Sequence, residues 1–192
     1  MLYRGHPGLE RVDEPIIIRS NPPYPVTEDL VGKPFHDWTM RNELDQDVKL
    51  SDRWANRTVL LLVFSSAFGV VCNLEMLTFT AMKKAFDEAN CEIFGVSNDS
   101  QRSLGAYSEN LNIGFHLLSD EGARMSRSLK AMEADDGPWP GFPKRSEFMI
   151  DRKGIIRYAH IPPDSNWEPD YDAILLEARK IAEEYRQEDQ GR

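Results

Sequence analysis

The sequence feature that most constrains the fold is the apolar run from Thr58 to Phe64, together with the loop of small residues after it. A run that is apolar on both faces is typical of a central strand covered on both sides. The loop 65–69 leads into residues 71–89, whose apolar spacing is that of an amphipathic helix. The segment therefore predicts a strand–loop–helix unit, with the loop at the carboxyl edge of a sheet.

The remaining predicted elements alternate along the chain. The early strand–helix–strand units imply parallel strands joined by right-handed crossovers, and a late hairpin around Gly154 adds antiparallel strands. The predicted fold class is α/β, a thioredoxin-like mixed central sheet flanked by helices. We expect strands at 92–96 and 115–118, helices at 103–111, 122–129 and 170–187, and hairpin strands at 147–150 and 155–159.

Two finer expectations concern helix ends and helix faces. Ser51 or Asp52 is expected to cap a short helix that begins near residue 49. In the helix after the small-residue loop, the apolar spacing turns Leu74 and Leu77 or Met76 toward the sheet.

The chain is expected to form one domain with an extension at its N-terminal end. Residues 1–28 are predicted to be a leader or arm because Pro15, Pro22, Pro23 and Pro25 disfavour a free-standing element. Residues 29–192 then form a single thioredoxin-like domain, a length that buries a substantial core.

Composition and charge exclude several classes of function. The net charge of −9 without a basic run argues against a nucleic-acid partner, and the longest apolar run, Val59–Phe64, is too short to span a membrane. The four histidines lack metal-ligand spacing, so we expect no metal and no cofactor. Residues 1–6 carry no apolar signal core, and two cysteines fit a reducing compartment, which predicts a cytoplasmic protein.

Cys72 lies in the first turn of the helix that follows the central strand. The partial positive charge of a helix N-terminus favours a thiolate, so we expect the pKa of Cys72 to lie below the value of about 8.5 for a free thiol. Position alone does not separate this interpretation from that of a buried, unreactive cysteine.

Two other residues near this unit, Cys91 and Arg145, can each be interpreted as functional or as structural. Cys91 follows the long helix, about 25 Å from Cys72 at ~1.5 Å per residue, whereas a disulfide needs Cα atoms within roughly 7 Å. We therefore interpret Cys91 as structural. Arg145 precedes a strand expected beside the Cys72 strand and could hold a thiolate, although its spacing alone favours a solvated loop cation.

The segment from Phe64 to Glu75 resembles the active-site loop of the peroxiredoxins, the alkyl hydroperoxide reductase and thiol-specific antioxidant family. Other segments resemble the family in the same order along the chain: Val31–Pro34 with Trp38, Val48–Asp52, Gly95–Ser100, Phe115–Asp120 and Arg145–Tyr158. The resemblance covers roughly residues 29–185, and its strength lies in the ordered set of segments.

The resemblance implies a thiol peroxidase. Cys72 would be the peroxidatic cysteine, whose thiolate becomes a sulfenic acid, and Arg145 would stabilise the thiolate and polarise the peroxide. Glu75 would orient the arginine, and Phe68 matches the aromatic residue of the loop. The implied partners are a peroxide substrate and an external thiol reductant, and the family implies a homodimer or larger homo-oligomer.

The active-site loop departs from the family pattern at two positions. Ser65 stands where the family has proline, which shields the thiolate from water, and Gly69 stands where the family has a threonine or serine that positions the peroxide. Ser65 or Ser66 could supply a substitute hydroxyl, or these serines could serve only to solvate the loop.

Three functions remain open from the sequence. The first is a one-cysteine peroxiredoxin that uses Cys72, and the second is a catalytically weak peroxiredoxin-like module for binding or redox sensing. The third is a thiol–disulfide oxidoreductase, which the absence of a Cys-x-x-Cys motif disfavours because exchange needs a nearby resolving thiol.

Overall fold

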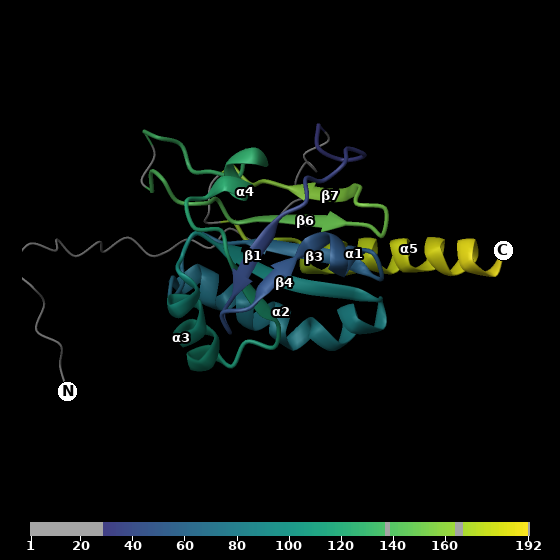
Figure 1. Ribbon diagram of the computed structural model, residues 1–192, viewed down its shortest axis with the longest axis horizontal. Coiled ribbons are helices and arrows are strands. Elements are labelled where there is room, and N and C mark those ends of the chain that lie inside the picture. The colour runs from purple at the N-terminus through teal and green to yellow at the C-terminus, as the bar shows by residue number, and fades with distance from the viewer. Residues whose placement is uncertain (1–28, 137–138, 164–166, 192) are drawn as a thin grey trace, which may run out of the picture.

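The computed structural model describes residues 29–136, 139–163 and 167–191, and these residues form a mixed sheet between two layers of helices (Figure 1). The predicted leader, residues 1–28, lies outside the described residues, so the boundary at residue 28 stays a prediction. The strands are β1 Thr39–Asn42, β2 Asp47–Lys49, β3 Thr58–Val63, β4 Cys91–Ser97, β5 His116–Ser119, β6 Ser146–Ile150 and β7 Ile156–His160. The helices are α1 Leu50–Trp54, α2 Val70–Glu88, α3 Gln101–Leu111, α4 Arg124–Ser128 and α5 Tyr171–Gln190.

The sheet confirms the predicted mixture of parallel and antiparallel strands. Its order is β2-β1-β5-β4-β3-β6-β7, in which β3, β4 and β5 run parallel and the other neighbouring pairs are antiparallel. All six residues of β3 are buried, as a strand covered on both faces requires. The hairpin of β6 and β7 turns at Gly154, whose positive φ of 74° suits glycine.

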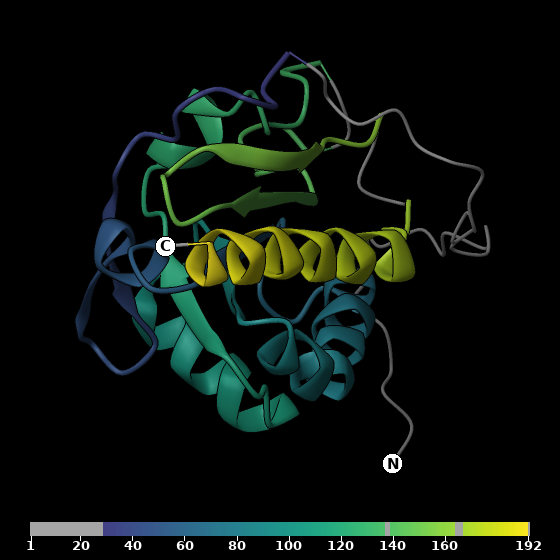
Figure 2. The same ribbon diagram turned by 90° about the vertical axis from the view of Figure 1, so that its right-hand side faces the viewer.

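Alternate residues of β3 enter two hydrophobic cores, one on each face of the sheet. Leu60 and Leu62 pack with residues of α2, α3 and α5, whereas Leu61 and Val63 pack with residues of α1 and α4. Figure 2 shows α5 lying across the first of these faces. Among the described residues, no helix is long and apolar enough to cross a membrane.

The two finer helix predictions need correction. The N-cap of α1 is Lys49, and neither Ser51 nor Asp52 caps it; instead, the Ser51 N–H donates to Asp37 Oδ1 at 3.0 Å. The cap therefore comes from an acceptor 14 residues earlier in the chain, outside the local pattern.

The predicted inner face of α2 is partly wrong. Met76 is buried as expected, but Leu74 and Leu77 are 44% and 42% exposed. Glu75 is fully buried in their place because a buried cation lies opposite it, as described below. The buried face of α2 therefore contains one member of an ion pair as well as apolar residues.

Candidate active site

Cys72 lies at the start of α2, where the loop after β3 enters the helix. Cys72 is the third residue of α2 and is 5% exposed. The loop is tied to the end of β4, because the Ala67 N–H donates to Asp99 Oδ2 at 2.8 Å and the Ser97 hydroxyl donates to the same oxygen at 2.8 Å. These bonds fix the loop backbone beside the thiol.

Phe68 is the exposed and strained residue of this loop. Its φ of 63° is in the left-handed region, which costs a non-glycine residue on the order of 1–3 kcal/mol. Its ring packs against that of Tyr107 in α3, with ring centroids 5.2 Å apart. The surrounding structure therefore holds the loop in a conformation that the chain would not choose locally.

Gly69 is the N-cap of α2 and borders the thiol directly. A Cβ atom placed on Gly69 would lie 3.4 Å from Cys72 Sγ. The φ of Gly69 is −65°, and its nearest contacts are at van der Waals distance, so neither the backbone nor the available space requires glycine here. Position 69 is thus next to the thiol, as the resemblance implies, and lacks only the side chain.

Arg145 is buried at the same end of the sheet and is not the solvated cation that its spacing favoured. The antiparallel register pairs Val63, the last residue of β3, with Ser146, the first of β6, and so brings Arg145 to the edge from which α2 starts. Arg145 is 1% exposed. Its guanidinium donates to the Trp167 carbonyl and to Glu168 Oε1, both at 3.1 Å.

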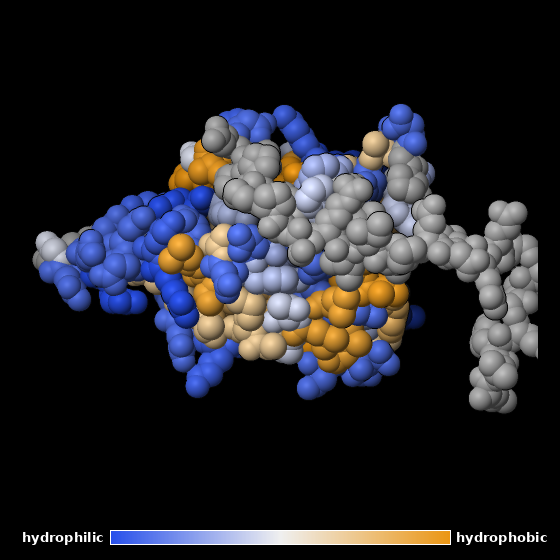
Figure 3. Space-filling view, turned by 180° about the vertical axis from the view of Figure 1, so that it is seen from behind, coloured by the Kyte–Doolittle hydropathy of each residue, from blue (hydrophilic) through white to orange (hydrophobic). Residues whose placement is uncertain are grey.

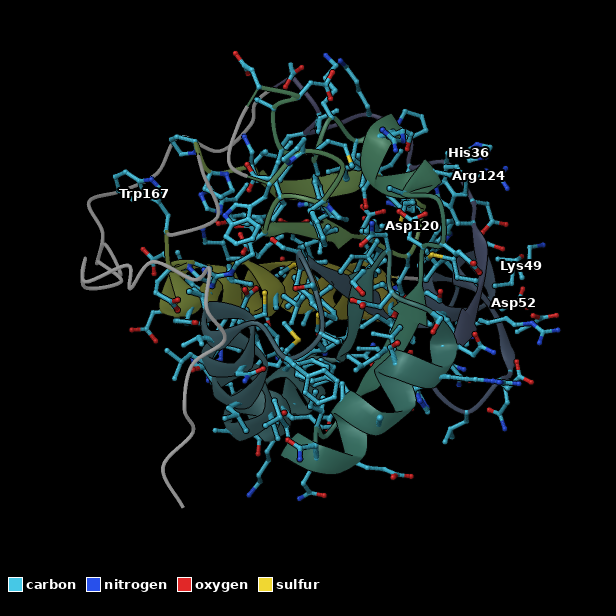
Figure 4. The ribbon with its side chains drawn as sticks, turned by 90° about the vertical axis from the view of Figure 1, so that its left-hand side faces the viewer. His36, Lys49, Asp52, Asp120, Arg124 and Trp167 are labelled. Atoms are coloured by element: carbon cyan, nitrogen blue, oxygen red, sulfur yellow. The ribbon has the colours of Figure 1, made fainter. Side chains whose placement is uncertain are left out.

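Figure 4 labels Trp167, which lies on the side of the molecule where α5 begins. The segment before α5 therefore supplies two of the acceptors that hold the guanidinium. These acceptors are separated from Arg145 by more than twenty residues, and no local sequence motif predicts them.

Glu75 is fully buried in α2, one turn after Cys72, and accepts from Arg145 Nε at 2.5 Å. Burial raises the pKa of Glu75 to about 7, although the charge of Arg145 opposes this shift and Glu147 adds to it. Arg145 thus joins two elements of the site, because it contacts the helix that carries Cys72.

The expectation of a lowered pKa for Cys72 is wrong. Burial raises the pKa of the Cys72 thiol above its ordinary value, and the charge of Glu75 adds to this shift. Hydrogen bonding by the backbone of Ser66 and Ser65 and the charge of Arg145 act in the opposite direction without prevailing. The position of Cys72 in the sequence predicts that it lies at a helix N-terminus, but it does not predict how far the sulfur atom is removed from water.

This raised pKa predicts the pH dependence of thiol reactivity. The thiolate fraction rises with pH through a pKa above the free-thiol value, so alkylation of Cys72 by iodoacetamide is expected to keep accelerating above pH 8.5. The measurement is the alkylation rate from pH 6 to 10, followed by mass spectrometry of the Cys72 peptide. A plateau reached by pH 7 would show instead that the helix N-terminus and Arg145 outweigh burial.

The sequence analysis missed several residues of this buried cluster. Tyr107 in α3 packs against the loop, and the pair Glu147 and His160 is buried on β6 and β7 with a 2.5 Å contact between Glu147 Oε2 and His160 Nδ1. The inward positions of charged residues in both hairpin strands were the available signal for this pair. Within the described ranges, no group of three or more His, Cys, Asp or Glu residues is arranged to hold a metal ion.

The geometry defines a class of protein: an α/β fold with a cysteine at the N-terminus of the helix after the central strand, beside a buried arginine. The profile of the AhpC/TSA family matches residues 31–159. Peroxiredoxin-2 of Cricetulus griseus is 32% identical over 139 residues, which are 66% of this chain and 67% of that protein. The chloroplastic 2-Cys peroxiredoxin BAS1 of Hordeum vulgare is 30% identical over 145 residues, 69% of this chain and 66% of that protein.

Solved structures agree with this fold. A peroxiredoxin-like protein from Aquifex aeolicus matches with a TM-score of 0.71 at 20% identity, covering 79% of this chain and 86% of that one. Peroxidoxin BcpB from Mycobacterium tuberculosis matches with a TM-score of 0.69 at 21% identity, covering 79% and 97%. The chain belongs to the AhpC/TSA family of peroxiredoxins, with the thioredoxin-like fold expected from its sequence, and it is a thiol peroxidase by class.

Proposed function

We propose that the protein is a one-cysteine peroxiredoxin that reduces hydrogen peroxide or organic hydroperoxides through a sulfenic acid at Cys72. The observation that carries the proposal is the position of Cys72 at the start of α2, at the edge of the sheet to which the β3–β6 register brings Arg145. The backbone of Ser65 and Ser66 and the charge of Arg145 favour the thiolate, against the burial that raises the pKa of Cys72. The family supports peroxide and a thiol reductant as co-substrates.

The proposed reaction begins with attack of the Cys72 thiolate on one peroxide oxygen. A sulfur–oxygen bond forms and the oxygen–oxygen bond breaks, so sulfur loses two electrons and the peroxide gains them. The departing oxygen takes up a proton and leaves as water or an alcohol. Arg145 lowers the barrier because its guanidinium attracts the negative charge that develops on that oxygen.

Glu75 serves as a positioning residue in this mechanism. Its carboxyl group holds Arg145 Nε from within α2, while Trp167 and Glu168 hold the two terminal nitrogens. A guanidinium fixed at three points presents the same face to the substrate in each turnover, which a freely rotating cation would not.

Regeneration by an external thiol is supported by the location of Cys91. Cys91 opens β4 and pairs with Thr58 at the start of β3, whereas Cys72 follows the end of β3. A six-residue strand spans roughly 20 Å at ~3.3 Å per residue, and a disulfide needs Cα atoms within about 7 Å. One reductant thiol then forms a mixed disulfide with Cys72 and releases water, and a second thiol frees Cys72.

The cellular compartment stays a proposal. Cys72 and Cys91 are both free and buried, which fits a reducing compartment such as the cytoplasm.

Self-association, as a homodimer or larger assembly, is also a proposal. It is supported by exposed apolar residues in and beside the first turns of α2, which are Phe68, Val70, Leu74 and Leu77. Figure 3 shows hydrophobic side chains gathered on one part of the molecular surface. Sedimentation velocity would measure the oligomeric state.

The test is a single turnover. Reduced protein is mixed rapidly with one equivalent of hydrogen peroxide, and the sulfenic acid is trapped with dimedone and located by mass spectrometry. We expect Cys72 to be labelled faster than a free thiol is oxidised, with no disulfide between Cys72 and Cys91 within one chain. Oxidation no faster than that of a free thiol would instead favour the catalytically weak module for binding or redox sensing.

A further inference from the structure

The loop of this protein carries a hydroxyl group close to position 69, where the side chain itself is missing. The Cβ atom that Gly69 does not have would lie 3.4 Å from Cys72 Sγ and 3.5 Å from the hydroxyl oxygen of Ser66. Thiol and hydroxyl therefore border the same small volume beside the N-terminus of α2. No other side chain atoms are among the three nearest to that point, the remaining one being the Ser66 carbonyl oxygen at 3.4 Å.

Ser66 is also placed to use this hydroxyl group. The residue is half-buried, and within the described part of the chain no hydrogen bond of its side chain is found. Its backbone contributes a hydrogen bond that favours the Cys72 thiolate. The residue thus touches the nucleophile through its main chain and keeps a donor available for a small molecule that reaches the sulfur.

We propose that Ser66 donates a hydrogen bond to the bound peroxide and so replaces the hydroxyl group missing at position 69. This inference rests on the proposed peroxidase function and names the group that orients the substrate. The Ser66 proton is not transferred; its hydrogen bond strengthens as negative charge builds on the departing oxygen. The proposed donor lies three residues before position 69 in the chain and borders the same volume beside the thiol.

Two neighbouring hydroxyl groups are weaker candidates. The Tyr107 hydroxyl is unpartnered among the described residues, but it is wholly buried, whereas Ser66 is half-buried. Ser65 already has an interaction of its own, and its side chain is not among the nearest neighbours of the space at position 69. Tyr107→Phe therefore provides a comparison, since it removes a different hydroxyl group beside the same loop.

The test is a cycle of four proteins: the wild type, Ser66→Ala, Gly69→Thr and the double variant. Stopped-flow measurement of Cys72 oxidation is expected to show a loss of about 10- to 150-fold for Ser66→Ala, the range for a hydrogen bond to a charged group. In the Gly69→Thr background, where a hydroxyl group returns at the family position, Ser66→Ala is expected to cost less than about 3-fold. Tyr107→Phe keeps the ring that packs against Phe68, and it is expected to lose less of the oxidation rate than Ser66→Ala does.

A second readout separates substrate binding from a structural role. Alkylation of Cys72 by iodoacetamide needs the thiolate but no donor to a peroxide, so Ser66→Ala is expected to alkylate at the wild-type rate. Equal loss of alkylation and oxidation, an unaltered oxidation rate in Ser66→Ala, or the same loss in both backgrounds would each overturn the inference. A wild-type protein that forms no sulfenic acid would instead overturn the peroxidase function itself.

Discussion

Replacing Cys72 by serine is expected to abolish peroxide consumption, and the same replacement of Cys91 is expected to leave it intact. A serine hydroxyl remains protonated at neutral pH and is a far weaker nucleophile toward an oxygen–oxygen bond than a thiolate. Arg145 and the loop backbone cannot compensate, because they stabilise charge but attack nothing. The expected rate for Cys72→Ser is therefore that of peroxide in buffer with reductant alone.

Cys91→Ser is a well-matched control for this comparison. Both cysteines are free and buried, so each substitution places a hydroxyl group where a thiol lay and costs about 1–3 kcal/mol if the hydroxyl finds no partner. The measurement is peroxide consumption with dithiothreitol as reductant, with urea unfolding of both variants alongside. Residual turnover in Cys72→Ser, or loss of turnover in a stably folded Cys91→Ser, would remove Cys72 from its proposed role.

Replacing Arg145 by methionine is expected to lower the rate of Cys72 oxidation by about 10²- to 10³-fold, the usual cost of removing one donor to a developing oxyanion. Stability is expected to fall by about 3–5 kcal/mol, because Glu75 loses its buried cation. Arg145→Lys keeps a charge but not the planar fork that reaches Glu75, Glu168 and the Trp167 carbonyl together, so it is expected to lose most of the rate as well.

A double variant separates the two effects of Arg145. In Arg145→Met with Glu75→Gln, a neutral amide replaces the buried carboxyl group that lost its cation, so the free energy of unfolding should recover in part while the oxidation rate stays low. Stability comes from denaturant unfolding, and the rate comes from stopped-flow mixing with peroxide. A double variant that regained both stability and rate would show that Arg145 only supports the fold.

The fold was predictable because its main determinants are local. The apolar run of β3, the small-residue loop and the long helix after it are readable from consecutive residues. Cys72 was placed at the right helix turn for the same reason. Even the hairpin was marked by a short turn with glycine at its end, whose positive φ the structure has.

The interior of the candidate site was less predictable because its partners come from distant parts of the chain. Glu75 is separated from Arg145 by 70 residues, and the pattern of α2 alone placed Leu74 inward rather than Glu75. The same limitation explains why the direction of the Cys72 pKa shift was predicted wrongly, since the desolvation of a sulfur atom depends on all the residues packed around it. Local sequence located the nucleophile but not its environment.

The pairing of β3 with β6 also bears on how this chain tolerates changes in length. The location of Arg145 is set by five ladder pairs, from Val59 with Ile150 to Val63 with Ser146, rather than by the long connection between α4 and β6. Insertions or deletions in the middle of that connection should therefore leave Arg145 at the edge of the sheet from which α2 starts. One residue added within β6 would instead reverse which of its side chains face each layer of helices. A reporter peptide that follows the oxidation state of Cys72 could be carried in that connection.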